Sequence, residues 1–309
     1  MSLIKPPLHP SCFPDELPYG YLKRLAELNQ YDSPAWLFRE LSSPSRLQNP
    51  MFSSAQLSSA NWAGGGETPS SVCSNTRYLR FCPLCIMENG YWKSSWQSWV
   101  SCACTRHQIW LVDRCPSCFI TLPLKSTELL NCACGTRLAD AAKEIIDIPV
   151  ERMQAFLDEG VIPPDHPLLP CTHGLDYSIR ASFISFLCTW LDYPNLTPQR
   201  FNRELMRCNT ARIHFMNAAD MLFQQDGLEV FLFRLSQRDN PEHYSSHILR
   251  FVLRLNISFP EPCFQVLKRE AMNYWVQMRS ALDMEQGRSS DISDLWEYAE
   301  WQVLPHDPK

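Results

Sequence analysis

Closely spaced cysteines, together with one histidine, are the residues of this chain best suited to chemistry. Eight of the fourteen cysteines lie between residues 81 and 135. Cysteines at this density form disulfides, bind metal or carry out redox chemistry. The N-terminal segment has three prolines in its first ten residues and no apolar signal segment. We therefore expect a cytoplasmic location, where thiols stay reduced and disulfides are the least favoured use.

The first set of ligand-type residues pairs a C-x-x-C motif with a C-x-x-H motif. Cys82 and Cys85 form the first motif, and Cys104 with His107 forms the second. Two short-spaced pairs on separate turns can bring four ligands to the corners of a tetrahedron, the geometry that structural zinc prefers. Cys102 offers an alternative register two residues before Cys104, but the C-x-x-H spacing favours Cys104 and leaves Cys102 as a buried thiol.

A second set follows directly and consists of cysteines alone. Cys115 and Cys118 form a C-x-x-C motif, and Cys132 with Cys134 forms a C-x-C motif. A complete set of four protein ligands leaves no position for water or substrate, so we expect two structural zinc ions per chain and no catalytic one. Because structural zinc contributes about 10–16 kcal/mol at neutral pH, we expect this module to unfold without metal.

Thiol chemistry is the main alternative to structural zinc. A thioredoxin-like C-x-x-C motif lies beside a strand–helix–strand unit, and no such pattern surrounds these motifs. Cys171 and His173 resemble a nucleophile–base pair, but no third group at a fitting spacing orients the base. His243 and His247 lie one helical turn apart without an acidic residue between them, so a solvated helix face is favoured. We likewise expect no ligand role for His166.

Tryptophans and basic residues accompany the cysteines. Small metal modules bury aromatic residues to build a core, so we expect packing as the role of the four tryptophans, with an exposed partner contact as the alternative. The basic residues are compatible with phosphate contacts without being specific for them. These residues are Trp92, Trp96, Trp99 and Trp110, and Arg77, Arg80, Lys93, Arg106 and Arg114. We expect the remaining cysteines to be small buried apolar residues; they are Cys12, Cys73, Cys171, Cys188, Cys208 and Cys263.

The segment before the cysteines is predicted to contain two helices. Tyr21, Leu22, Leu25 and Leu28 share one helical face. Residues 29–32 break the pattern, and a Ser33–Pro34 pair with Trp36, Leu37 and Leu41 predicts a second short helix. Two short helices around a four-residue break predict a helix-turn-helix, although helical hairpins that never contact DNA share the pattern. Residues 42–80 are rich in Ser, Asn, Gly and Pro and are interpreted as a loop or linker.

The C-terminal part is predicted to be an all-α bundle of five or six helices after a proline-containing separator over residues 145–174. Apolar stripes at helical spacing carry this prediction: Ile179, Phe183, Ile184, Leu187, Cys188 and Leu191, and then Leu249, Val252, Leu253 and Ile257. Thr197 and Asn240, each followed by proline, are predicted to open helices, and Ser290 to cap a last helix through Trp296. The predicted fold is thus mainly α, with a helix-turn-helix and linker (1–79), a zinc-ribbon-like double zinc module (80–145) and a helical domain (146–309).

Charge is unevenly distributed along the chain. The net charge is −5, yet residues 1–150 carry 13 Lys and Arg against 12 Asp and Glu, and residues 151–309 carry 15 against 21. A protein that held DNA mainly by neutralising phosphates would be more basic. The acidic C-terminal half, whose cations are nearly all arginine, favours protein partners or a local patch. No apolar run is long enough to predict a membrane span.

Four short segments resemble the TniQ family. They are DELPYGYLKRLAELN from Asp15, LRFCPLCIMENGY from Leu79, WVSCACTRHQIWL from Trp99, and RCPSC from Arg114. The resemblance covers residues 10–140, and residues 141–309 are similar only as a helical remainder of fitting size. It implies that the family's zinc pattern carries over to Cys82, Cys85, Cys104 and His107, whereas the order of the second set varies within the family.

The resemblance implies a function in transposition. TniQ proteins are accessory target-selection factors of transposons with a TnsABC-type machinery. Longer TnsD-like members bind an attachment site directly, while short members of CRISPR-associated transposons dimerise, dock on a Cascade–guide RNA effector and recruit the AAA+ regulator TnsC. The length and acidic C-terminal half of this chain favour the second type, a non-enzymatic adaptor that contacts target DNA indirectly or weakly. A TnsD-like DNA-binding selector is the alternative. Neither a G-x-x-x-x-G-K motif nor a transposase-type carboxylate set stands out.

Overall fold

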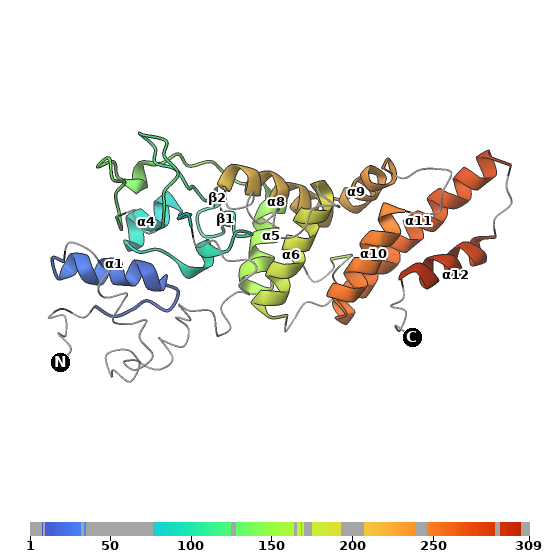
Figure 1. Cartoon of the computed structure of the whole chain (residues 1–309), viewed down its shortest axis with the longest axis horizontal. Coiled ribbons are helices and arrows are strands. Elements are labelled where there is room, and N and C mark those ends of the chain that lie inside the picture. The colour runs from blue at the N-terminus through green and yellow to red at the C-terminus, as the bar shows by residue number, and fades with distance from the viewer. Residues whose placement is uncertain are drawn as a thin grey trace. The chain divides into compact units, whose positions relative to one another are not determined.

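The computed structural model divides the chain into two compact units (Figure 1). Unit 1 consists of residues 1–147 and 197–213, and unit 2 of residues 148–196 and 214–309. The structure describes residues 8, 10–31, 34, 77–124, 128–163, 166–167, 169, 175–192, 207–238, 246–287 and 291–303. Within these ranges it contains nine α-helices and one two-stranded sheet, which confirms the mainly helical fold class. The boundaries predicted at residues 79/80 and 145/146 stay a prediction.

Unit 1 combines short helices with a small hairpin. Its elements are α1 (Pro18–Leu28), α4 (Pro83–Asn89), the 3₁₀ helices η3 (Ser94–Gln97) and η4 (Leu138–Asp140), β1 (Ala103–Cys104), β2 (Ile109–Trp110), and the start of α8 (Cys208–Phe223). The strands β1 and β2 are antiparallel, with Cys104 opposite Ile109. Phe81 and Val112 exchange two backbone hydrogen bonds of 2.9 Å, which brings the first C-x-x-C motif alongside this hairpin.

The first predicted N-terminal helix is present as α1, and its predicted apolar face is buried except at Leu28, which is 47% exposed. Leu22 and Leu25 are fully buried, and the backbone N–H of Leu17 donates to the carbonyl of Trp92 over 2.6 Å. A Cβ atom on Gly20 would lie 3.2 Å from the Trp92 Cβ atom, so the helix packs closely on this residue. The predicted second helix, with Trp36, Leu37 and Leu41, lies outside the described residues.

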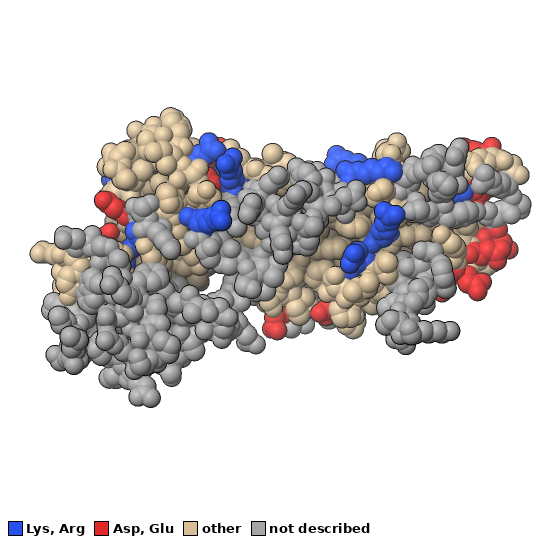
Figure 2. Space-filling view, in the orientation of Figure 1, with Lys and Arg blue, Asp and Glu red and all other residues tan. Residues whose placement is uncertain are grey.

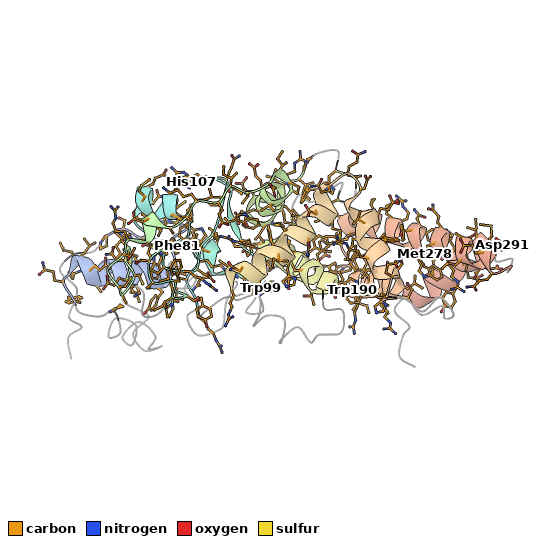
Figure 3. The ribbon with its side chains drawn as sticks, turned by 90° about the horizontal axis from the view of Figure 1, so that it is seen from above. Phe81, Trp99, His107, Trp190, Met278 and Asp291 are labelled. Atoms are coloured by element: carbon orange, nitrogen blue, oxygen red, sulfur yellow. The ribbon has the colours of Figure 1, made fainter. Side chains whose placement is uncertain are left out.

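The four tryptophans of the cysteine-rich segment form the core of unit 1. Trp92 and Trp99 are at most 1% exposed, and Trp96 and Trp110 are 4% and 7% exposed. Figure 3 labels Trp99, Phe81 and His107, which all lie in unit 1. Packing is therefore confirmed as their role, and the alternative of an exposed partner contact is wrong for these four residues.

Arg80 is part of this core as well, which corrects its interpretation as a surface charge. Its side chain is buried, and the guanidinium donates to the carbonyls of Trp99 over 2.6 Å and of Ser101 over 2.9 Å. A buried guanidinium needs several acceptors in fixed positions. Arg80 therefore holds the chain that leads into β1 and does not contact phosphates.

Side chains also tie the first turn of α8 to the cysteine-rich segment. The buried Asp113 carboxylate accepts the backbone N–H of Cys208 over 2.8 Å, which favours the start of a helix because this N–H has no partner within it. Arg212 donates to the carbonyl of Leu111 and to the Glu144 carboxylate, each over 2.6 Å. The sequence pattern did not indicate these contacts, since they join residues about one hundred positions apart.

Unit 2 is all helical in the part that the structure describes. Its helices are α5 (Ile148–Glu159), α6 (Tyr177–Asp192), the remainder of α8, α9 (Gly227–Ser236), α10 (His247–Ser258), η5 (Pro262–Phe264), α11 (Gln265–Glu285) and α12 (Ile292–Val303). The predicted stripes on α6 and α10 are largely buried, as in Phe183, Leu187 and Val252. The helix openings predicted at Thr197 and Asn240 lie outside the described residues.

Two predictions for unit 2 need correction. Residues 148–159 form helix α5, whereas we interpreted them as part of a separator; the prolines nearby hid the spacing of Met153, Phe156 and Leu157, which are all buried. A proline in the first turn is compatible with a helix because its missing N–H has no partner there.

The last helix extends to Val303, beyond the predicted Trp296. Asp291, labelled in Figure 3, accepts the backbone N–H of Ser293 over 2.8 Å at its start.

Basic and acidic side chains of unit 2 gather over different helices. Figure 2 shows blue atoms over α9 and α10, whose exposed arginines are Arg234, Arg250 and Arg254; Arg238 is exposed just after α9. Red atoms lie over the end of α11 and the start of α12, where Glu285, Asp291 and Asp294 are exposed. The positive charge of the acidic C-terminal half is thus concentrated locally. Among the described helices, none has both the length and the apolar character to span a bilayer.

His166 is buried in unit 2 with both ring nitrogens engaged. Its Nε2 atom donates to the carbonyl of Leu222 over 2.9 Å, and its Nδ1 atom accepts the N–H of Leu169 over 3.1 Å. These partners assign the neutral tautomer, because a protonated ring would present a second N–H to the N–H of Leu169. Burial, followed by repulsion from Arg152, lowers the pKa of His166 below its ordinary value of 6.5.

We predict that acid destabilises the fold through His166. The folded state keeps the ring neutral while the unfolded chain binds a proton, so stability is complete above about pH 6.5 and is lost as the pH falls toward the lowered pKa. His166→Gln should be less stable at about pH 7.5 but should lose less stability on acidification to about pH 5.5. Urea unfolding at both values measures the difference, with His247→Gln as the control. Parallel losses in wild type and His166→Gln would contradict this role.

Candidate metal centre

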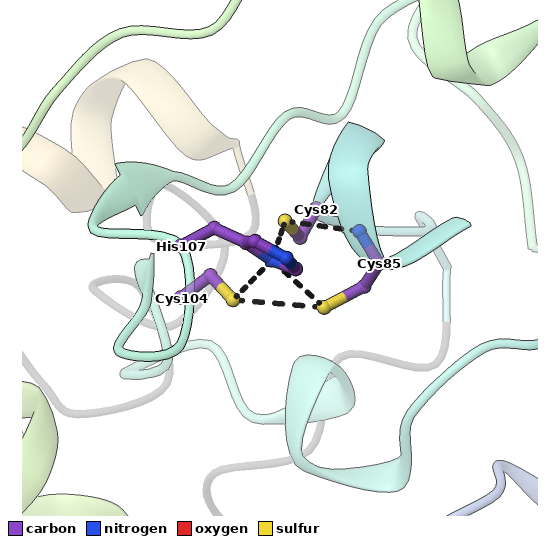
Figure 4. Close-up of side chains that lie close together, drawn as sticks. All are labelled: Cys82, Cys85, Cys104 and His107. Carbon is purple, nitrogen blue, oxygen red and sulfur yellow. Dashed lines mark hydrogen bonds between the residues drawn. The ribbon is translucent and has the colours of Figure 1, made fainter. Parts of the chain in front are cut away.

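The structure brings the first predicted ligand set together (Figure 4). The ligand atoms of Cys82, Cys85, Cys104 and His107 all lie within 4.8 Å of one another. The Nδ1 atom of His107 lies 3.4 Å, 3.3 Å and 3.6 Å from the sulfurs of Cys82, Cys85 and Cys104. The sulfurs of Cys85 and Cys104 are 3.7 Å apart.

These separations fit a tetrahedral zinc ion. Two thiolates about 2.3 Å from zinc lie about 3.8 Å apart at the tetrahedral angle, and a thiolate and an imidazole nitrogen lie about 3.6 Å apart. The four donors also have the soft sulfur and nitrogen character that zinc prefers. The cluster is therefore compatible with one metal ion, for which zinc is the best match.

Local sequence positions the first C-x-x-C motif at the start of a helix. Cys82 is the N-cap of α4, and its sulfur accepts the backbone N–H of Cys85 over 3.4 Å. Pro83 follows at the first helical position, where its fixed φ is favourable. Gly90 ends α4 in the left-handed conformation with φ of 68°, which suits glycine.

The second half of the site lies on the turn between β1 and β2. Cys104 ends β1, and His107 lies in the turn before β2. The Nε2 atom of His107 lies 3.0 Å from Oε1 of Glu88 on α4. We assign the ring proton to Nε2, which donates to the carboxylate and leaves Nδ1 to bind metal. Arg106 contacts the other oxygen of Glu88 over 2.8 Å.

Glu88 is a residue of this site that the ligand spacing did not predict. A carboxylate that accepts the second N–H of a metal-binding imidazole fixes the tautomer and the orientation of the ring. Its signal is in the sequence: Glu88 follows Cys85 by three positions on a short helix, so both lie on one face. The acidic residue of the segment CPLCIMENGY therefore has a structural explanation.

The second predicted set also forms one group. The ligand atoms of Cys115, Cys118, Cys132 and Cys134 lie within 4.8 Å of one another. The sulfurs of Cys115 and Cys134 are 3.5 Å apart, and those of Cys118 and Cys132 are 3.7 Å apart. These distances again match a tetrahedron of thiolates around zinc.

Two tight turns form this second group. Residues 113–122 make a hairpin in which Arg114 pairs with Thr121, and residues 131–137 make another in which Asn131 pairs with Arg137. Gly135 has a φ of 84°, so glycine suits the turn after Cys134. The four sulfurs bring the two turns together, and Leu122 and Leu138 at their ends are buried in the core of unit 1.

The cysteine thiols of both clusters have shifted pKa values, and a metal ion must displace the protons that the thiols with raised pKa values hold. Hydrogen bonds with Cys82 and Cys85 lower the pKa of Cys104 to about 2, while the hydrogen bond with Cys104 raises the pKa of Cys82 to about 11. The hydrogen bond with Thr136 lowers the pKa of Cys134 to about 6. Without metal, neighbouring thiols thus share a limited negative charge. Filling either site requires full deprotonation and releases protons.

The structure describes some, but not all, of the other cysteines and histidines for which we made a prediction. Cys102, Cys188, Cys208 and Cys263 are buried and lie outside both clusters, as expected, whereas Cys12 is only partly buried. Among the described residues, the two clusters are the only groups of three or more close metal-ligand side chains. Cys73, Cys171, His173 and His243 lie outside the described residues, and His166 has the structural role given above.

Both clusters are compatible with a closed four-ligand metal site that organises short turns. The TniQ family model matches residues 51–111, so this segment carries a TniQ family domain. It contains the whole first cluster, begins within the predicted linker and ends before Cys115. The resemblance that we noted at residues 10–50 and 112–140 lies outside the matched segment. No curated protein matches the chain.

Metal removal tests the ligand sets. We predict about two zinc ions per purified chain, because each cluster offers four donors. Cys85→Ser should lose about one zinc and unfold the surrounding turns, since structural zinc contributes about 10–16 kcal/mol. Cys102→Ser is the matched control and should keep both ions. Elemental analysis and circular dichroism measure both effects. Loss of zinc from Cys102→Ser with retention in Cys85→Ser would contradict the assignment.

Glu88 gives a second prediction for the same site. Glu88→Gln should weaken zinc binding roughly 10- to 100-fold, because the imidazole loses its charged acceptor. Competition with a chromogenic chelator measures the affinity. Glu144→Gln removes an exposed carboxylate of unit 1 that pairs with Arg212 and should leave zinc affinity unchanged. Equal affinities in wild type and Glu88→Gln would show that Glu88 does not orient His107.

Proposed function

We propose that this protein is a non-enzymatic target-selection adaptor in transposition. The observation that carries the proposal is the TniQ family match over residues 51–111, because a TniQ domain implies a transposition target-selection protein. The closed first cluster lies within that segment. It supports a scaffolding role, since complete ligand sets leave no coordination position for substrate.

The proposed partners follow from the TnsABC-type machinery of the family. The chain docks on an RNA-guided Cascade effector at target DNA and recruits the AAA+ regulator TnsC and through it the transposase. It does so as a homodimer in the cytoplasm. The net charge of −5 supports docking on a nucleoprotein complex over a general grip on DNA.

A TnsD-like selector that binds DNA directly is the second candidate. The exposed arginines of α9 and α10 favour it, because Arg250 and Arg254 lie one helical turn apart on the same exposed face. A local patch of this kind can contact phosphates even on an acidic unit. The two candidates differ in whether the protein alone has appreciable affinity for duplex DNA.

Co-purification separates the candidates. The adaptor is expected to co-purify with a Cascade–guide RNA complex and to leave duplex DNA unshifted when tested alone. A gel shift by the protein alone, weakened steeply by salt and lost in Arg250→Gln/Arg254→Gln, would contradict the adaptor and favour the TnsD-like selector. A neighbouring CRISPR array with transposition genes would support the adaptor independently.

A further inference from the structure

The hairpin of residues 113–122 exposes an aromatic ring at its turn. Phe119 is 71% exposed and Ile120 is 60% exposed. The backbone beneath them is fixed, since the N–H of Phe119 donates to the carbonyl of Cys115 over 3.1 Å and the N–H of Cys115 donates to the carbonyl of Ile120 over 3.0 Å. Cys115 and Cys118 of the second cluster hold the same turn. The ring is therefore presented by a rigid support.

Phe119 occupies a backbone conformation that favours glycine. Its φ is 57°, in the left-handed region, where a bulky side chain is uncommon and costs free energy. The neighbouring turn offers a direct comparison: Gly135 follows ligand Cys134, as Phe119 follows ligand Cys118, and has a φ of 84°. One turn thus carries glycine at this position, and the other carries phenylalanine.

Folding alone does not account for Phe119. The side chain brings backbone strain and leaves an apolar ring in water, while burying little surface in return. Strain and exposed apolar surface together are features of binding sites. The exposed surface of Phe119 and Ile120 is much smaller than a typical protein–protein interface, which covers about 800 Å² per partner. It suits a flat ligand of ring size.

Each of the two hairpins carries an exposed arginine next to the second cluster. Arg114 and Arg137 are exposed, whereas Asp113 is buried and accepts the N–H of Cys208. Arg114 directly precedes ligand Cys115, and Arg137 lies three residues beyond ligand Cys134. Guanidinium groups pair well with phosphate, and exposed aromatic rings stack on unpaired bases.

We propose that Phe119 stacks on an unpaired base of single-stranded nucleic acid, with Arg114 and Arg137 contacting the adjacent phosphates. The site takes one or two nucleotides and has no base preference, because every base offers a stacking face. Four thiolates around one zinc ion would carry a net charge of about −2 and so offset the charge of both arginines, so stacking supplies most of the affinity. This contact goes beyond the adaptor function and does not depend on Cascade, TnsC or the dimer.

Fluorescence anisotropy with a labelled oligothymidylate of about 12 nucleotides tests the proposal. Phe119→Gly should weaken binding roughly 5- to 150-fold, the loss of one stacked base, and Phe119→Trp should retain binding. Two phosphate contacts predict a shallow slope of about −1.4 for the logarithm of affinity against the logarithm of salt. Arg114→Gln/Arg137→Gln should flatten that slope.

The glycine variant also serves as its own folding control. Because glycine relieves the strain at φ of 57°, Phe119→Gly should keep its zinc content and its thermal stability. Phe233→Ala, which removes another exposed ring on α9, should bind the oligonucleotide like wild type. Equal binding by wild type and Phe119→Gly, absence of binding by wild type, or tighter binding of duplex that ignores Phe119 would each overturn the proposal. None of these outcomes would bear on co-purification with Cascade.

Discussion

The closure of two four-ligand sets is the constraint on which the cysteine-rich part of this protein depends. The described segment that holds them contains one short α-helix, a hairpin of two-residue strands and several tight turns, which do not fold stably by themselves. Cys85 and Cys118 lie in different turns, so the two sets link different parts of the segment. The buried tryptophans and Arg80 pack in the same unit.

A closed site also determines what the protein does not do at its metals. With a metal ion bound, four protein donors would leave no place for an activated water, and the site would serve to hold the chain. Glu88 fits this role, because a carboxylate behind His107 stiffens the ring and creates no reactive group. Function must then reside on the surfaces that the cross-links support. The exposed ring of Phe119 in unit 1 is one such surface, whereas the arginine face of α10 belongs to unit 2, outside the segment that holds the clusters.

Local patterns in the sequence predicted much of this structure, while long-range contacts escaped them. The spacing of the cysteines predicted both sets, and helical periodicity predicted α6 and α10, because each signal lies within a few residues. Helix α5 was missed since nearby prolines concealed a buried face, and Arg80 was misjudged because burial depends on carbonyls some twenty residues away. The roles of Asp113, Glu88 and His166 depend on partners that only the folded chain brings near. The left-handed conformation of Phe119 could not be predicted from its residue type.

The central claim is that two closed sulfur-rich sites hold the cysteine-rich part of this protein together. Zinc K-edge X-ray absorption on the purified full chain tests it most directly. The account predicts a dominant sulfur shell at about 2.3 Å, with seven sulfur ligands and one imidazole nitrogen shared between the two ions and no oxygen from water. A spectrum with an oxygen shell, or with fewer sulfur than nitrogen and oxygen ligands, would contradict the closed sites and reopen the question of metal-based chemistry.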